Sequence, residues 1–159
     1  MGLKFNELIG EQLHERYKHL AIYGPALQGK TKLAKHIAEK YNGIYLDLLQ
    51  DFFKKDELKT GIDVFGPSKL ITFINQRQGA SQLMIIDQMD FLINTWDDPQ
   101  LREFLVFIDR NQSEVCCLFI LQSNRILERE ALIKPNDKGH NRLINILNIQ
   151  QGGTIDGEN

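Results

Sequence analysis

Residues 24–31 have the residue types and spacing of a phosphate-binding loop, with a glycine, four intervening residues and then Gly-Lys-Thr. Backbone N–H groups of such a loop turn toward an anion, and the following helix adds its positive end. Lys30 can reach the β- and γ-phosphates of a nucleotide, and Thr31 can place its hydroxyl on Mg²⁺. The competing interpretation is a plain strand-to-helix turn. The predicted Walker A loop for ATP comprises Gly24, Pro25, Ala26, Leu27, Gln28, Gly29, Lys30 and Thr31.

Asp87 provides a second candidate, because it ends the apolar run Leu-Met-Ile-Ile. A carboxylate at the end of a strand holds Mg²⁺ through its water shell in many nucleotide hydrolases. An aspartate at a strand end is common by itself, so Asp87 gains weight from the loop that precedes it. Thr31 and Asp87 are therefore the predicted metal residues, and we expect the strand of Asp87 to lie next to the first strand.

A third candidate is the polar end of the run Leu-Phe-Ile-Leu-Gln-Ser-Asn, where Ser123 and Asn124 follow the apolar residues. A polar side chain at this point can hydrogen-bond the γ-phosphate or the attacking water. Ser and Asn are frequent in turns after strands, so this signal is weak without the other two.

The elements that must position these residues alternate along the chain, and the strands are continuous apolar runs. Such runs are typical of a parallel sheet covered on both faces. The predicted fold class is α/β, a three-layer sandwich with a five-stranded mainly parallel sheet. Helices are predicted at 3–17, 30–41, from Gly66 to Gly79, over 94–110 with Asp98 as its cap, and at 126–133. Residues 1–150 form the predicted nucleotide-binding domain, 50–66 are expected to be irregular and 151–159 a disordered tail.

Composition narrows the function classes. The chain has 159 residues, a net charge of −2 and no apolar run long enough to span a membrane. A dedicated nucleic-acid binder usually carries a clear basic excess, which is absent here. The adjacent Cys116 and Cys117 would point to opposite faces of a strand, so we expect two buried thiols, no zinc site and a reducing, cytoplasmic setting.

Together the three motifs resemble the AAA+ family of ATPases over about residues 1–150. The resemblance implies a P-loop NTPase core in which Asn124 takes the sensor-1 role. It also places Arg142, just before the fifth strand, where the family often keeps an arginine finger for the γ-phosphate of a neighbouring subunit. A surface charge after a loop is the alternative interpretation of Arg142.

The chain also departs from that family pattern. Gln88 stands where the family usually has the glutamate that polarises water, and an amide cannot take up a proton as a carboxylate can. Asp90 is a candidate substitute, although it can instead cap a turn. Leu27 replaces a frequent glycine of the loop, and we expect no helical lid after the fifth strand.

The favoured hypothesis is a weak, Mg²⁺-dependent ATPase that oligomerises around nucleotide and regulates or assembles partner proteins. Its minimal core resembles the small P-loop component of bacterial BREX phage-defence systems, which implies an antiviral or DNA-associated complex with indirect nucleic-acid contact. One alternative is a small-molecule or nucleotide kinase, in which Asp47 could bind a substrate. The other is a non-catalytic nucleotide sensor or adaptor, which Gln88 favours.

Overall fold

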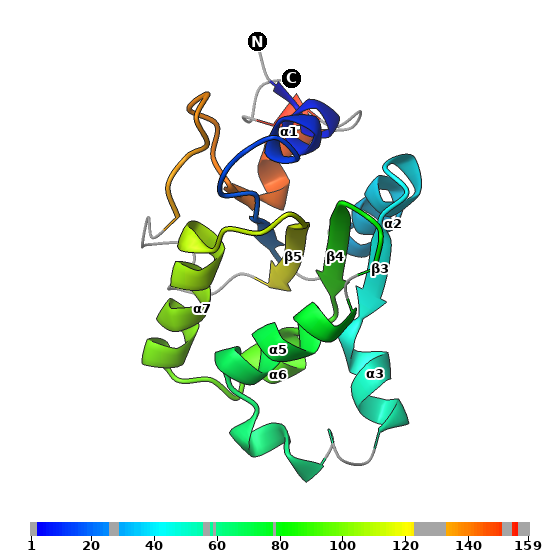
Figure 1. The fold of residues 1–159 in the computed structure, drawn as a ribbon, viewed down its shortest axis with the longest axis vertical. Coiled ribbons are helices and arrows are strands. Elements are labelled where there is room, and N and C mark those ends of the chain that lie inside the picture. The colour runs from blue at the N-terminus through cyan, green and yellow to red at the C-terminus, as the bar shows by residue number, and fades with distance from the viewer. Residues whose placement is uncertain are drawn as a thin grey trace.

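The computed structural model describes residues 3–25, 29–55, 58, 60–77, 79–122, 133–150 and 154–155. Its centre is a sheet of five strands, all parallel, in the order β3-β4-β5-β2-β6. The strands are β2 (Leu20–Gly24), β3 (Ile44–Asp47), β4 (Leu83–Asp87), β5 (Cys116–Gln122) and β6 (Leu143–Asn145). This confirms the predicted α/β class and its five-stranded sheet (Figure 1).

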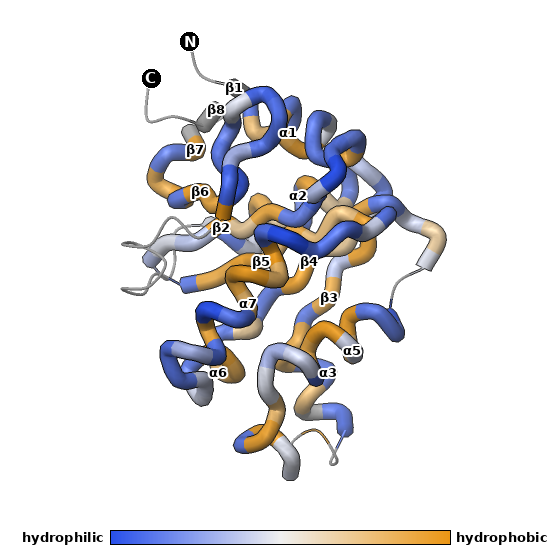
Figure 2. The backbone as a smooth tube through the Cα atoms, turned by 60° about the vertical axis from the view of Figure 1, so that its left-hand side comes forward, coloured by the Kyte–Doolittle hydropathy of each residue, from blue (hydrophilic) through white to orange (hydrophobic). Residues whose placement is uncertain are grey.

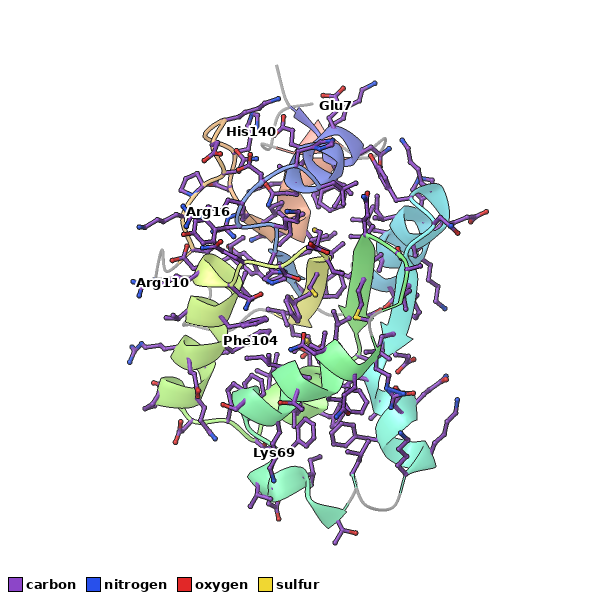
Figure 3. The ribbon with its side chains drawn as sticks, viewed as in Figure 1. Glu7, Arg16, Lys69, Phe104, Arg110 and His140 are labelled. Carbon is purple, nitrogen blue, oxygen red and sulfur yellow. The ribbon has the colours of Figure 1, made fainter. Side chains whose placement is uncertain are left out.

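Helices cover both faces of the sheet and make the three layers. On one face lie α1 (Phe5–Gln12) and α2 (Lys30–Lys40), and on the other α3 (Leu48–Lys54), α5 (Pro67–Arg77), α6 (Asp90–Ile93) and α7 (Asp98–Arg110). Alternate strand residues enter separate cores, so Cys116 joins the first face and Cys117 the second, both as free thiols. Hydrophobic residues run through the central strands (Figure 2), and Phe104 points from α7 toward them (Figure 3).

The helix boundaries follow local chemistry. Asn42 adopts φ 53° just after α2, and the N–H of Gly43 donates to the carbonyl of Ala38, so the helix ends here. The cap of α7 is one residue earlier than expected: Asp97, not Asp98, accepts from the N–H of Gln100 at 2.8 Å. The Gln100 side chain accepts from Asp97 N–H in return, so a capping box selects this start.

The segment expected to be irregular, 50–66, instead contains most of α3 and a 3-10 turn, Ile62–Val64. Asp47 caps α3, because its carboxylate accepts from the N–H of Gln50 at 3.0 Å. A local side-chain cap of this kind starts a short helix without strong periodicity in the sequence. The helix predicted at 126–133 lies, apart from Ile133, outside the described residues.

Both ends of the described chain contribute to a second, small sheet. Its strands are β1 (Leu3–Lys4), β7 (Ile149–Gln150) and β8 (Thr154–Ile155), paired antiparallel in the order β1-β8-β7 beside α1 (Figure 2). Two residues of the tail expected to be disordered thus form a strand. The edge strand β6 ends at Asn145, because Asn145 caps a 3-10 turn at Ile146–Asn148 before β7 begins.

Candidate nucleotide-binding site

The candidate site lies at the carboxyl edge of the parallel sheet, where β2 ends at Gly24 and α2 begins at Lys30. Gly29 takes φ 79° immediately before the helix, a left-handed conformation that glycine adopts without steric cost. A Cβ on Gly24 would lie 2.2 Å from Cγ2 of Ile146, so the strand end also needs a glycine for close packing. Gly29 is thus favoured by its backbone conformation and Gly24 by close packing against Ile146.

Lys30 points back over the beginning of the loop. Its ammonium donates to the carbonyl of Gly24 at 3.0 Å and to that of Pro25, and only 8% of the residue is exposed. Burial lowers the pKa of Lys30, while the carboxylates of Asp90 and Asp87 oppose that change. The result is a desolvated cation held at the mouth of the loop.

Asp87 accepts hydrogen bonds from several neighbouring groups of the site. Its Oδ2 accepts from the hydroxyl of Thr31 at 2.7 Å and from the hydroxyl of Tyr45 at 2.7 Å. Its Oδ1 accepts from the N–H of Gln88 at 2.8 Å, and Asp87 is only 3% exposed. Gln88 has φ 60°, and its amide donates to Oγ1 of Thr31 at 3.3 Å.

The route by which Thr31 reaches Asp87 differs from the one expected. The strand of Asp87 was predicted to lie next to the first strand, and this is wrong, because β5 lies between β2 and β4. The connection is made by α2, which starts at the end of β2 and packs on β4 and β5. The helix therefore carries Thr31 across β5 to Asp87.

Asp90 lies at the same edge, three residues after Asp87, at the start of α6. Its Oδ1 accepts from the backbone N–H of Gln122, the last residue of β5, at 2.7 Å. Burial raises the pKa of Asp90, while this hydrogen bond and the charge of Lys30 counteract the rise. Asp90 thus ties α6 to β5 and also lines a cavity of about 410 Å³ that includes Lys30, Thr31 and Gln88.

The donor set fits a nucleotide with its magnesium ion. Mg²⁺ is usually held by one or two protein oxygens together with phosphates and waters. Thr31 and Asp87 supply such oxygens in contact, and Lys30 supplies the nearby positive charge. Among the described residues no cluster of three His, Cys, Asp or Glu side chains could hold a metal by itself.

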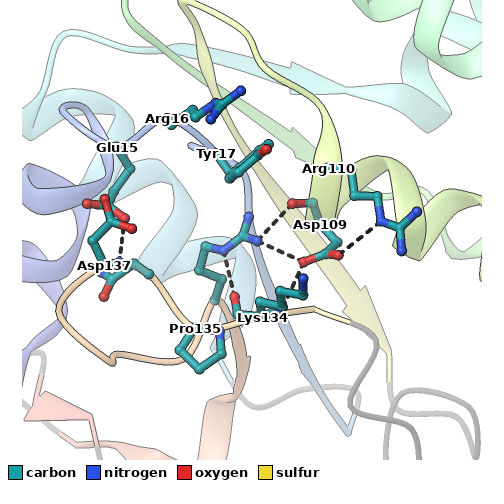
Figure 4. Close-up of a pocket in the computed structure, with 10 residues that line it drawn as sticks. Glu15, Arg16, Tyr17, Asp109, Arg110, Lys134, Pro135 and Asp137 are labelled. Carbon is teal, nitrogen blue, oxygen red and sulfur yellow. Dashed lines mark hydrogen bonds and ion pairs between the residues drawn. The ribbon is translucent and has the colours of Figure 1, made fainter.

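Arg142 lies at the opposite end of the sheet, since its carbonyl accepts from the N–H of Ala21 at the start of β2. It is 2% exposed, and its five N–H groups donate to the carbonyls of Lys134, His19, Ile108 and Asp109 and to the Asp109 carboxylate. Figure 4 shows the hydrogen bonds at Lys134 and Asp109. A guanidinium with every donor used inside its own subunit cannot reach a phosphate of another. The arginine-finger prediction for Arg142 does not fit this placement.

Four predicted residues cannot be placed, because Ala26, Leu27, Gln28 and Asn124 lie outside the described residues, as does Ser123. Pro25 is described, and its carbonyl contacts Lys30. The structure therefore brings together Gly24, Pro25, Gly29, Lys30, Thr31, Asp87 and Asp90, and separates Arg142 from them.

The sequence analysis did not identify Tyr45 as a residue of the site. It lies on β3, whose register pairs it with Ile85 and pairs Asp47 with Asp87, so its hydroxyl reaches Asp87 diagonally across two strands. No motif marks this residue, and only the pairing of β3 with β4 would have indicated it.

Comparison with curated proteins finds partial similarity to Lon protease homologues. The chain is 34% identical over 101 residues to the mitochondrial Lon protease homologue of Candida albicans, covering 60% of this chain. It is 33% identical over 99 residues to that of Candida dubliniensis and 31% over 101 residues to that of Debaryomyces hansenii. The chain spans 9% of the length of each of these relatives. No protein-family model matches the chain. The similarity to Lon supports an AAA+-like core.

In the part of the chain that the structure describes, no helix has the length and apolar character needed to cross a membrane.

Proposed function

We propose that this domain binds ATP together with Mg²⁺ at the cluster of Lys30, Thr31 and Asp87, and hydrolyses it slowly. The observation that carries the proposal is the 2.7 Å hydrogen bond between the Thr31 hydroxyl and the Asp87 carboxylate, beside the buried ammonium of Lys30. This arrangement joins the two halves of a phosphate and metal site that are far apart in the sequence. The similarity to Lon protease homologues supports an ATP-binding core of the AAA+ type.

Each residue has a definite task in this proposal. Lys30 exchanges the carbonyls of Gly24 and Pro25 for phosphate oxygens, which are stronger acceptors because they are charged. Thr31 would keep its hydrogen on Asp87 and offer its oxygen to the metal, whose positive charge would be supplied to the phosphates. Asp87 would accept a hydrogen bond from the water around that ion.

Slow turnover follows from the side chains near the site. Gln88 cannot accept a proton from water, and its amide is engaged with Thr31 at 3.3 Å. Asp90 is the carboxylate proposed as the base, but it is held by the N–H of Gln122. Activation of water then depends on Asp90, whose carboxylate also holds α6 to β5 through the N–H of Gln122.

Oligomerisation around nucleotide belongs to the same proposal and is supported by the AAA+-like core, since AAA+ ATPases of the Lon type oligomerise. Control or assembly of partner proteins and a cytoplasmic location are proposed from the sequence alone, and the relatives it matches are named as mitochondrial. A phage-defence or DNA-associated setting rests on the sequence resemblance alone, and Arg142 no longer supports contact between subunits through an arginine finger.

The second candidate function is a non-catalytic nucleotide sensor. Gln88 favours it, because the residue next to the metal carboxylate has no acid-base capacity and contacts Thr31 directly.

The proposal is tested by Lys30→Ala, with Lys40→Ala at the exposed end of the same helix as the control. Calorimetry with Mg-ATP, phosphate release and molecular mass are measured in parallel. Loss of a charge-assisted hydrogen bond predicts affinity at least about tenfold weaker for Lys30→Ala and unchanged for Lys40→Ala. Equal ATP affinity in all three proteins would refute the site. Binding with no phosphate release favours the sensor, and ATP consumption only with an added metabolite, without free phosphate, favours a kinase.

A further inference from the structure

Tyr45 donates a hydrogen bond to the Asp87 carboxylate from outside the loop, α2 and the turn after β4. Its hydroxyl donates to Oδ2 of Asp87 at 2.7 Å, the same oxygen that accepts from Thr31. The two hydroxyls thus approach one carboxylate oxygen from different elements, Thr31 from α2 and Tyr45 from β3.

The hydrogen-bonding capacity of Asp87 shows what this contact does. A carboxylate has about four acceptor positions, two on each oxygen. Oδ2 receives Thr31 and Tyr45, and Oδ1 receives the N–H of Gln88. Three donors from three elements fix the plane of the carboxylate and leave its one remaining acceptor position on Oδ1.

The Tyr45 ring is itself held in place. Tyr45 sits on β3, which pairs with β4 in a register that aligns Tyr45 with Ile85. Its ring packs beside the core formed by α1, α2 and the sheet, and the ammonium of Lys35 lies 5.4 Å from the ring centroid. A rigid ring on a paired strand positions its hydroxyl with little freedom, so the bond to Asp87 is well defined.

The hydrogen bond from Tyr45 contributes more to the orientation of Asp87 when Thr31 is also a metal ligand. In the proposed function the Thr31 oxygen takes a metal ligand position, and Thr31 is then constrained by the ion as well as by Asp87. Tyr45 makes no such change and remains a fixed donor to Oδ2. Partners that orient a ligand from behind typically change metal affinity about 10- to 100-fold when removed.

From this geometry we propose that Tyr45 is a positioning residue that orients Asp87 toward the water shell of the metal and so sets the Mg²⁺ affinity of the site. The inference rests on the proposed function, because it concerns the same carboxylate. It assigns to β3 a part in metal binding that the loop and strand motifs do not indicate. Tyr45 contacts neither nucleotide nor metal in this role and acts through Asp87.

The test is Tyr45→Phe, which removes one oxygen and keeps the ring over which Lys35 lies. Tyr41→Phe is the matched control, because the Tyr41 hydroxyl also donates a hydrogen bond, to the carbonyl of Asn6, away from Asp87. ATP binding is measured by calorimetry first with EDTA and then at increasing Mg²⁺, at constant ionic strength. Circular dichroism confirms that each variant is folded.

Tyr45→Phe is expected to raise the Mg²⁺ concentration for half-maximal tightening of ATP binding by about tenfold. Binding in EDTA should stay within about twofold of the unaltered protein, and Tyr41→Phe should behave like the unaltered protein in both conditions. In an Asp87→Ala background, adding Tyr45→Phe should cause no further change, since the hydroxyl has lost the group it positions.

Three results would overturn the inference. An unchanged Mg²⁺ requirement means that the hydroxyl does not position the carboxylate, and a lower requirement means that it competes with the metal's water shell. Equal weakening with and without Mg²⁺ means that Tyr45 only maintains the fold. These outcomes leave the proposed function intact, whereas absence of any ATP binding by the unaltered protein removes both.

Discussion

The hydroxyl of Thr31 and the carboxylate of Asp87 lie 2.7 Å apart, although the strands that precede and carry them are separated by β5. The contact exists because α2 crosses the sheet and packs against β4. Any change that moves α2 relative to β4 therefore alters both halves of the proposed phosphate and metal site together. Because of this coupling, a substitution of one side chain at the carboxyl edge is expected to affect the whole proposed site.

Gln88→Glu should speed ATP hydrolysis by about tenfold or more. A glutamate at this position adds a group that can take a proton from water, and general bases contribute about 10² or more to rates. The backbone at φ 60° costs Glu as much as Gln, so the fold should be unaffected. Phosphate release under saturating Mg-ATP measures the effect.

The control for that experiment is Gln88→Ala, which removes the donor to Thr31 without supplying a base. A rise in hydrolysis in both variants would show that Gln88 inhibits through its hydrogen bond, and no rise in either would place water activation elsewhere.

Asp90→Asn should reduce residual hydrolysis by about 100-fold if Asp90 is the base. The amide oxygen can still accept from the N–H of Gln122, so the tie between α6 and β5 is kept. Burial raises the pKa of Asp90 above 3.8, so in the unaltered protein the rate should fall as the pH drops and the carboxylate gains its proton. If Asp90→Asn and the unaltered protein hydrolyse ATP at the same rate and with the same pH profile, Asp90 is excluded as the base.

The sequence predicted those elements whose signal is local. Continuous apolar runs indicated each strand of the main sheet. Gly24 and Gly29 indicated the loop because close packing on Ile146 and a left-handed backbone favour glycine there, and Lys30 indicated it through its charge. The predicted cap of α7 was wrong by one residue. Asp97 and Asp98 are both good capping residues, and only the hydrogen bonds with Gln100 select Asp97.

Features set by strand order and pairing could not be predicted in the same way. Tyr45 meets Asp87 because β3 pairs with β4, and Arg142 is buried because the 134–142 loop folds back on the ends of β2 and α7. In a parallel sheet a residue just before a strand lies at the amino edge, away from Gly24, so the direction of the strands already separates Arg142 from the loop. Its burial depends on the path of residues 134–142, which no local pattern indicates.

Arg142→Met should lower the free energy of unfolding by about 3–5 kcal/mol, because it leaves the carboxylate of Asp109 buried without its partner at 3.1 Å. Urea unfolding measures the loss. The exposed Arg110, 3.7 Å from the other Asp109 oxygen, is the matched control, and Arg110→Met should cost about 1 kcal/mol or less. Adding Asp109→Leu to Arg142→Met should recover part of the stability.

That experiment also tests the revised view of Arg142. ATP affinity of the folded Arg142→Met protein should be unchanged, since the residue lies at the end of the sheet away from Gly24. A variant with unaltered stability but no hydrolysis would restore the arginine finger.

His19 should make the protein less stable as the pH falls from about 6.5 to about 4. The residue is 1% exposed, and burial, aided by the charge of Arg142, lowers its pKa to about 4. Its Nδ1 accepts from the N–H of Cys117 and its Nε2 faces Oδ1 of Asn111, an arrangement that suits the neutral ring. Between these two pH values the unfolded chain binds a proton that the folded chain does not, so folding weakens as the pH drops, by up to about 3 kcal/mol.

Urea unfolding of the unaltered protein and of His19→Gln, at a series of pH values from 7 to 4, checks this prediction. Glutamine offers one acceptor and one donor without titrating, so the His19→Gln curve should fall less steeply across that window, although its stability near pH 7 is lower from imperfect packing. His36→Gln, on the exposed face of α2, should retain the full slope. Because the pKa of His19 is lower in the folded state, the unaltered protein must lose more stability than His19→Gln as the pH falls. Parallel curves for the unaltered and His19→Gln proteins would assign the acid sensitivity to other groups.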